Sequence, residues 1–214
     1  MQSISSIVDE VKEYAQDVLN HQLSENLTYH SITHTKDVVA SANEIAKKLG
    51  LDEEEVEILI IAAWFHDMGY TKGHENHEME SCKMAKKFLI ERGYTEEKLK
   101  RVIGCIMATQ MPQNPKNRLE RVLCDADLMH LADDNYFDKA DLLHKELESI
   151  KLCSISENEW LEMNQEFLSN HCFFTDYAKH NYESGVKKNL KKIRVILHCS
   201  ASLLTLLDIQ EAYL

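Results

Sequence analysis

The stretch EEEVEILIIAAWFHDMGY, residues 53–70, joins an apolar run to an adjacent histidine and aspartate. No glycine or proline interrupts the run before Gly69, which predicts a buried helix over Asp52–Asp67. This helix would carry His66 and Asp67 at its end. Consecutive side chains on a regular helix diverge by about 100°. We therefore expect the helix to open near Gly69, so that both side chains reach one point.

The rest of the chain continues the helical pattern outward from this stretch. Only 6 glycines and 2 prolines interrupt 214 residues, and no segment shows the alternation typical of a strand. The sequence predicts an all-α fold in which Gly50, Gly69 and Gly93 end helices in the left-handed conformation. The other predicted helices span about residues 3–23, 33–49, 75–92, 95–109, 116–132, 135–149, 157–170, 174–180 and 183–213.

An excess of acidic residues limits the partners that the protein can bind. The 36 aspartates and glutamates against 24 lysines and arginines give a formal net charge of −12. A field of this sign repels DNA and RNA, whereas a small phosphate ester can bind where metal ions supply local positive charge. The only concentrated basic cluster indicates a solvated amphipathic face, with a phosphate contact as the alternative. Its members are Lys187, Lys188, Lys191, Lys192 and Arg194.

Cysteine usage and the absence of targeting signals predict a cytoplasmic protein without a membrane anchor. The six cysteines form no CxxC pair and lie mostly in apolar helical patterns, which is typical of reduced thiols. They are Cys82, Cys105, Cys124, Cys153, Cys172 and Cys199. The N-terminal MQSISSIVDEVKEY lacks the features of a secretory signal, and VILHCSASLLTLL, residues 195–207, is too short for a membrane span.

Further histidines and aspartates join the pair as candidate metal ligands. His34 opens the predicted helix over residues 33–49, and two aspartates, Asp125 and Asp127, lie in the segment CDADLMHLADD. Their i, i+2 spacing points them to nearly opposite faces of a helix, so only one of them should reach the metal. Imidazole combined with carboxylate suits a divalent ion such as Zn, Mn, Fe or Mg.

A histidine, a His-Asp pair and a distant aspartate, in this order, resemble the HD superfamily of metal-dependent phosphohydrolases. The resemblance implies an HD-domain-like helical bundle in which His34, His66, Asp67 and Asp127 hold the metal. It favours Asp127 over Asp125 because the family places its aspartate after a small residue and before a larger one, as in Ala-Asp-Leu here.

Two segments beside these ligands are candidates for proton transfer. YHSITH is similar to the YHxxxH segment of class I cyclic-nucleotide phosphodiesterases, which implies that His34 binds metal and His30 acts as general acid. The i, i+4 spacing would place both on one helical face; the alternative for His30 is a helix-start residue hydrogen-bonded to its neighbours. His74, His77 and Glu78 offer a second metal site or a contact to a substrate phosphate, the alternative being solvated residues at a helix start.

The implied activity is metal-dependent hydrolysis of a phosphate ester, either a nucleoside monophosphate or a cyclic nucleotide, with one or two divalent ions as cofactor. Asp67 would bridge two ions, and His30 or His77 would assist the leaving oxygen by proton transfer. The alternatives are an HD-type di-iron oxygenase, for which His74 and His77 are the deciding positions, and a non-catalytic sensor that keeps metal for stability.

The expected organisation is a single helical domain over residues 1–214. Its HD-type metal-binding core would span residues 28–149, and residues 150–214 would form a C-terminal helical extension. The expected partner is a small phosphorylated molecule, neither a nucleic-acid polymer nor a membrane. The sequence leaves the metal, the substrate and the oligomeric state open.

Overall fold

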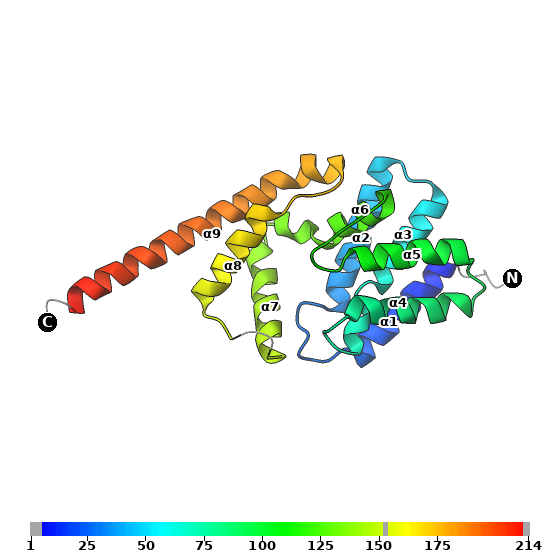
Figure 1. The fold of residues 1–214 in the computed structure, drawn as a ribbon, viewed down its shortest axis with the longest axis horizontal. Helices are drawn as coiled ribbons and strands as arrows, with labels where there is room; N and C mark the ends of the chain where they lie inside the picture. The colour runs from blue at the N-terminus through cyan, green and yellow to red at the C-terminus, as the bar shows by residue number, and fades with distance from the viewer. Residues whose placement is uncertain (1–5, 152–153, 212–214) are drawn as a thin grey trace. The chain divides into compact units, whose positions relative to one another are not determined.

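The computed structural model describes residues 6–151 and 154–211, with side chains up to residue 199, and confirms the all-α prediction. Nine α-helices and two 3₁₀-helices form the regular structure of these described residues, which contain no strand (Figure 1). The helices are α1 (Ile7–Gln22), α2 (Ile32–Leu49), α3 (Glu53–Phe65), η1 (Met68–Thr71), α4 (His77–Ile90), α5 (Glu96–Ala108), α6 (Arg118–Asp127), η2 (Met129–Ala132), α7 (Tyr136–Ser149), α8 (Glu157–Asn170) and α9 (Asp176–Glu211).

The chain divides into two compact units. The N-terminal unit comprises the residues up to Met129 together with Phe173–Lys179, and therefore holds α1 to α6 and the first turn of α9. The C-terminal unit comprises His130–Cys172 and the residues from His180 onward, which form α7, α8 and the rest of α9. All the residues proposed above as metal ligands belong to the N-terminal unit.

Helix α3 occupies the centre of the N-terminal unit. It packs against α1, α2, α4, α5 and α6, and every side chain from Ile58 to Phe65 is buried. A helix that is apolar on all sides is stable only in such an enclosed position. Its polar start is fixed by a capping box between Asp52 and Glu55. Because the enclosed run ends at Phe65, the residues that follow it are delivered to the interior of the unit.

Glycines end two of the predicted helices as expected, and a third has a different role. Gly50 and Gly93 adopt φ values of +65° and +70°, which confirms the left-handed conformation. The prediction for Gly69 was wrong, because this residue lies inside η1 and outside the positive-φ region. A Cβ at Gly69 would lie 1.8 Å from the carbonyl oxygen of His77. Glycine is required here for the close approach of two backbone segments.

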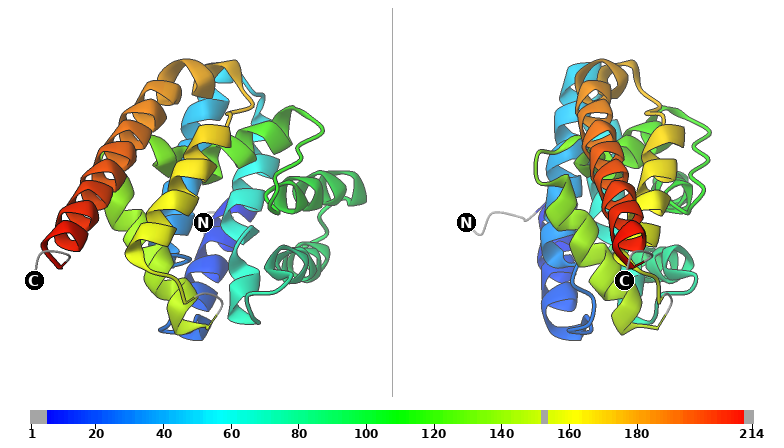
Figure 2. Two further views of the ribbon diagram at one scale, coloured as in Figure 1. Left: turned by 60° about the vertical axis from the view of Figure 1, so that its left-hand side comes forward. Right: turned by 90° about the vertical axis from the view of Figure 1, so that its left-hand side faces the viewer.

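Two other predicted boundaries differ from the structure. Helix α6 ends at Asp127 and the turn η2 follows it, whereas the predicted helix ran on to residue 132. Conversely, the two helices predicted over residues 174–180 and 183–213 are one continuous helix, α9, which Figure 2 shows as a single rod. Gly185 lies inside α9, where a Cβ would come within 2.4 Å of the carbonyl oxygen of Ala132. This glycine therefore serves packing and does not end the helix.

Polar contacts hold the elements of the C-terminal unit together. The buried Asn189 of α9 donates hydrogen bonds from its side-chain amide to the carbonyl oxygens of Leu131 at 3.0 Å and Asp133 at 2.8 Å. The rings of His144 on α7 and Trp160 on α8 stack at 4.8 Å, with 6° between their planes. Among the described residues, no helix combines the length and apolar character that crossing a membrane requires.

The described cysteines agree with the expectation of reduced thiols. Cys82, Cys105, Cys124, Cys172 and Cys199 are all free, and Cys153 lies outside the described residues. Burial, with a smaller effect of a nearby glutamate in each case, raises the pKa of the Cys82 and Cys105 thiols to about 12. Such thiols are poor nucleophiles at neutral pH.

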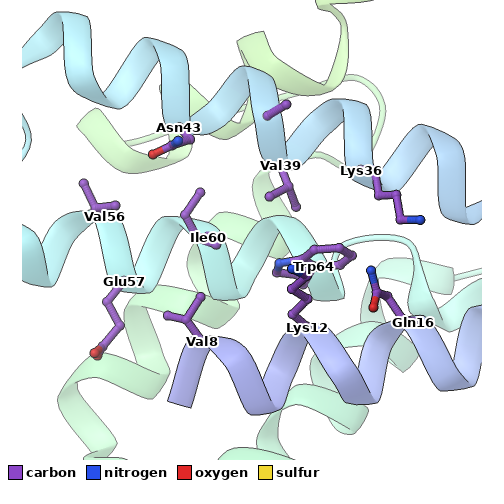
Figure 3. Close-up of a pocket in the computed structure, with 11 residues that line it drawn as sticks. Val8, Lys12, Gln16, Lys36, Val39, Asn43, Val56, Glu57, Ile60 and Trp64 are labelled. Atoms are coloured by element: carbon purple, nitrogen blue, oxygen red, sulfur yellow. The ribbon is translucent and has the colours of Figure 1, made fainter. Parts of the chain in front are cut away.

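A groove with a volume of about 570 Å³ runs between α1, α2 and α3 (Figure 3). Ile60 and Trp64 of α3 line it together with Lys12 of α1 and Lys36 of α2. None of the candidate metal ligands lines this groove. The candidate site therefore lies elsewhere in the N-terminal unit.

Candidate metal centre

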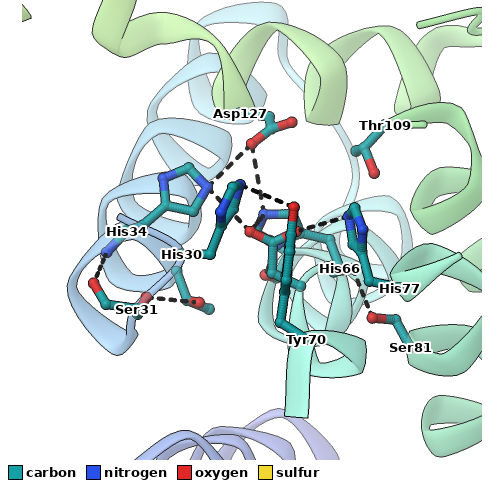
Figure 4. Close-up of polar contacts among 12 residues, drawn as sticks. His30, Ser31, His34, His66, Tyr70, His77, Ser81, Thr109 and Asp127 are labelled. Atoms are coloured by element: carbon teal, nitrogen blue, oxygen red, sulfur yellow. Dashed lines mark hydrogen bonds and ion pairs between the residues drawn. The ribbon is translucent and has the colours of Figure 1, made fainter. Parts of the chain in front are cut away.

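The ends of four helices converge on one point in the N-terminal unit (Figure 4). His34 stands in the first turn of α2, where the N-cap Ser31 accepts a hydrogen bond from its backbone N–H. His66 and Asp67 directly follow α3, and Asp127 is the last residue of α6. His77 is the first residue of α4. Each helix is held in place by its own packing. The side chains at its end therefore have defined positions.

The four metal ligands that the resemblance implies lie close together. The Nε2 atom of His34 is 3.3 Å from Oδ2 of Asp67 and 3.2 Å from Oδ1 of Asp127. The Nε2 atom of His66 is 3.1 Å from the same Asp67 oxygen and 3.5 Å from the same Asp127 oxygen. One ligand atom each from His34, His66 and Asp127 falls within 4.8 Å of the others. This arrangement can hold a metal ion.

The hydrogen bonding of His66 fits a metal ligand. Its Nδ1 lies 2.8 Å from the carbonyl oxygen of Ala63 and donates to it, so Nε2 is the nitrogen that is directed at the two aspartates and would bind a metal. Nε2 of His66 and Oδ2 of Asp67 are both buried without a hydrogen-bond partner. Leaving two such atoms unsatisfied in a protein interior is unfavourable. A divalent cation between them would satisfy both, so the donor set fits the metal that the sequence predicts.

The turn after α3 brings the two consecutive side chains together. Asp67 has φ −106° and ψ 2°, outside the helix, so the divergence of about 100° expected on a regular helix does not apply. The hydroxyl of Ser81 accepts a hydrogen bond from the N–H of Gly69 at 2.8 Å and donates one to the carbonyl oxygen of His66 at 2.7 Å. Ser81 therefore fixes this turn against α4. No sequence pattern singles out this residue beyond its position one turn after His77 on the same helix face.

Mutual attraction sets the protonation of the cluster in the absence of metal. Burial opposes a charge on His34, but the contacts with Asp127 and Asp67 outweigh it and raise its pKa to about 9. Burial likewise opposes protonation of His66, and the two aspartates again raise its pKa well above the ordinary value. Burial alone would raise the pKa of Asp67 and Asp127, but the histidines hold both well below the ordinary value. Metal binding must therefore displace protons from the imidazoles.

A second group of polar side chains lies on the other side of Asp67. Its Oδ1 is 3.7 Å from Nε2 of His77, and the same nitrogen is 3.3 Å from Oε1 of the buried Glu78. The Nδ1 of His77 lies 3.1 Å from the carbonyl oxygen of His74, which orients the ring. The ring of His74 contacts Tyr70 at a centroid distance of 5.5 Å. The two oxygens of Asp67 thus face two different sets of ligand atoms.

Tyr70 is a residue of this site that the sequence did not single out. Its ring stacks between His30, at a centroid distance of 4.1 Å, and His77, at 3.9 Å (Figure 4). Its hydroxyl lies 3.1 Å from Nε2 of His30. His30 itself precedes α2, which begins at Ile32, so the prediction that His30 and His34 share a helical face was wrong. Their rings still lie near each other, with centroids 5.9 Å apart.

The two neighbouring aspartates of α6 point in different directions, as their spacing predicts. Asp127 faces His34 and His66. The fully buried Asp125 accepts hydrogen bonds from the backbone N–H groups of Phe174 at 2.7 Å and Thr175 at 2.8 Å. Asp125 therefore fixes the segment that leads into α9 within the N-terminal unit.

Comparisons with known proteins identify a family and two similar folds. Residues 31–132 match the family described as the HD domain. No curated protein matches the chain. A predicted HD superfamily hydrolase from an uncultured Thermotogales bacterium has a similar structure, with 18% identity, a TM-score of 0.60, and coverage of 88% of this chain and 90% of its own. A structural-genomics target from Lactobacillus plantarum is similar at 15% identity and a TM-score of 0.60, with coverage of 89% and 97%. At such identities, the likeness is one of fold.

Proposed function

The chain contains an HD domain over residues 31–132, and we propose that this domain makes it a metal-dependent phosphohydrolase. In this proposal His34, His66, Asp67 and Asp127 hold a divalent ion. The observation that carries the proposal is the pair of buried, unsatisfied atoms, Nε2 of His66 and Oδ2 of Asp67, 3.1 Å apart. An ionic ligand is the simplest partner for both of them.

The bound ion would supply a Lewis acid for a phosphoryl oxygen and a water of lowered pKa. The protein contributes the fixed positions of the ligands. The hydrogen bond from His66 to Ala63 holds one imidazole, and the N-cap at Ser31 fixes the helix turn that carries His34. Burial of His34, His66 and Asp67, and partial burial of Asp127, limit competition from bulk water for the ligand atoms.

His30 and His77 are the proposed proton-transfer groups. They flank Tyr70 from both sides, and their ring centroids are 6.4 Å apart. Either imidazole can give a proton to a leaving oxygen placed near Asp67. The stack on Tyr70 fixes both rings, so we assign Tyr70 the role of a positioning residue.

The proposed substrate is a small phosphate ester, either a nucleoside monophosphate or a cyclic nucleotide. The net charge of −12 opposes polyanions but allows a small anion to bind where metal charge is concentrated. A second divalent ion, held by Oδ1 of Asp67 with His77 and Glu78, would help to bind the phosphate. The contacts of His77 with both carboxylates support this second position.

The test is turnover by the full chain with Mn, Mg, Zn or Fe added, against a panel of nucleoside monophosphates and cyclic nucleotides. Asp67→Ala removes the residue that faces both ligand sets, and Asp17→Ala, an exposed position on α1, is the matched control. Product is measured by chromatography and bound metal by elemental analysis. We expect turnover by the parent and by Asp17→Ala, and neither turnover nor metal retention by Asp67→Ala.

The alternatives give different results in the same experiment. A di-iron oxygenase would retain iron with a mixed-valence spectrum and would release no phosphate from any ester of the panel. A sensor module would retain metal without turnover of any kind. Either outcome would contradict the phosphohydrolase proposal.

A further inference from the structure

Exposed large apolar side chains gather in the smaller, C-terminal unit. Among the described residues, Met163 and Val195 are exposed to 52% and 55%, and Leu142, Phe167 and Ile196 are also exposed. The larger N-terminal unit has four such residues, spread over two helices, α4 and α5, and the loop that follows α5. Single exposed apolar residues are normal, but clustered ones indicate an interaction surface.

One part of this surface is an acidic face of α8. Glu162, Met163, Glu166 and Phe167 follow the i, i+1, i+4, i+5 pattern that places residues on one side of a helix, and all four are exposed. We call these four residues the α8 face. Helix α8 carries four glutamates and no lysine or arginine. The α8 face is therefore apolar along one line and negatively charged beside it.

The other part is a basic groove along α9. Phe137 of α7 lines it together with five residues of α9, and its volume is about 580 Å³. Those five residues are Lys188, Lys191, Lys192, Val195 and Ile196. The amine of Lys192 lies 5.7 Å from the centre of the Phe137 ring, and Lys188 pairs with Asp134 at 2.7 Å. We call this the α9 groove; it presents apolar side chains bordered by positive charge.

The α8 face and the α9 groove have opposite charges, exposed apolar side chains and a similar spacing between their charged residues. Glu162 and Glu166 are one helical turn apart, and Lys188 is one turn from both Lys191 and Lys192, so the charges of each helix repeat at roughly 5 Å along its axis. Opposite charges arranged with the same repeat select the register of two docking helices. Met163 and Phe167 supply apolar side chains of a size that the α9 groove can take.

We propose that the α8 face of one copy of this chain docks in the α9 groove of a second copy. Each copy carries both surfaces, so a symmetric dimer forms the contact twice and closes. The net charge of −12 speaks against an anionic membrane or a nucleic acid as the occupant of the groove, because both would be repelled by the chain as a whole. A second copy carries the same net charge, but it brings apolar side chains beside the charges of its α8 face, and burial of these side chains offsets the long-range repulsion.

The experiment is sedimentation equilibrium of the full chain over a wide concentration range, at low and high salt. The parent is expected to exceed its monomer mass of 24.8 kDa as concentration rises, and high salt should weaken the association. Lys191→Glu and Glu162→Lys should each weaken self-association by roughly tenfold, because each places like charges opposite one another. The double variant restores opposite charges and should recover parental association.

Lys86→Glu, an exposed position on α4 in the N-terminal unit, makes the same charge change as Lys191→Glu and should leave the association unchanged. Helical content by circular dichroism, measured for every variant, separates loss of docking from loss of folding. A parent that stays monomeric at every concentration overturns the proposal, as does a double variant that associates no better than the single ones. The proposal is also overturned if the monomeric parent binds vesicles containing phosphatidylserine and Lys191→Glu abolishes this binding. In that case the α9 groove binds an anionic surface.

Discussion

Two aspartates separated by one alanine have different physical roles in this protein. Asp127 faces two histidines, and Asp125 accepts two backbone hydrogen bonds from Phe174 and Thr175. One residue is therefore a proposed metal ligand, whereas the other stabilises the fold. The difference follows from the helix, which turns side chains two positions apart to nearly opposite sides.

Asp125→Ala is expected to lower the free energy of unfolding by about 2–3 kcal/mol, because it leaves two backbone N–H groups without their acceptor. Asp127→Asn is expected to keep the fold and to lose metal binding. Urea unfolding and elemental analysis of both variants measure the two effects. An Asp125→Ala protein of parental stability, or an Asp127→Asn protein that retains metal, would contradict this division of roles.

The protonated state of His34 predicts how metal binding depends on pH. Contacts with the two aspartates outweigh burial and raise its pKa to about 9, so the metal-free site carries a proton there at neutral pH. Because the metal must displace this proton, together with the one that His66 holds, apparent affinity should rise by at least about tenfold per pH unit up to about pH 9. Titration calorimetry in buffers of different ionisation enthalpy should show proton release at pH 7. Equal observed heats of binding in all buffers, once the heat of dilution is subtracted, would contradict the prediction.

The same pKa affects the stability of the metal-free protein. A histidine whose folded pKa is raised stabilises the fold fully below its ordinary pKa of 6.5, and this contribution is lost as pH rises through about 9. Unfolding of the metal-free chain should therefore become easier from about pH 6.5 to 9. A flat or rising stability across this window would show that His34 does not gain a proton on folding.

At the scale of elements, the short helix η1 fixes the geometry of the site. Gly69 lets the backbone of η1 touch the first turn of α4, and Ser81 bonds to both sides of the turn. The N-terminal unit thereby positions Asp67 between the two ligand sets. A longer α3 would have turned His66 and Asp67 apart.

Gly69→Ala should destabilise the protein by about 2–4 kcal/mol and weaken metal binding, because its Cβ would overlap the His77 carbonyl oxygen and force the backbones apart. Gly104→Ala is the matched control. Its Cβ meets only the end of the Glu120 side chain, at 2.9 Å, within helix α5. Thermal unfolding and metal titration of both variants test this. Equal losses of stability and of metal affinity in the two variants would show that the close contact at η1 is not important.

At the scale of the whole molecule, the proposed metal joins elements that are far apart along the chain. Its ligands come from α2, the end of α3 and the end of α6, so a bound ion adds a link between helices whose other contacts are largely apolar. Such an ion stabilises the folded chain by mass action.

Removal of the metal should lower the melting temperature. With Mn at about one hundred times its dissociation constant, the stabilisation is about 2.7 kcal/mol, and EDTA should abolish it. Asp67→Ala should melt at the same temperature with and without EDTA. Differential scanning calorimetry provides the measurement. A parent whose melting temperature is unaffected once elemental analysis shows metal loss would contradict the proposed link.

Local pattern alone determined the helical class of this protein and most of its helix positions. Helical spacing and the scarcity of breakers depend only on residues a few positions apart, which is why seven of the ten predicted ranges align closely with helices of the structure. The candidate ligands could also be predicted from the sequence, because their residue types and their order along the chain are visible in it. The continuity of α9 did not follow from the sequence, which predicted two separate helices over residues 174–180 and 183–213.

Only the tertiary structure decided which contacts these residues make. The role of Asp125 depends on Phe174 and Thr175, about fifty positions later, and the need for glycine at position 69 depends on the backbone of His77. Tyr70 became part of the site only when folding placed it between two histidines. Local sequence determines which secondary structure each segment prefers. Which segments approach each other closely depends on how the whole core packs.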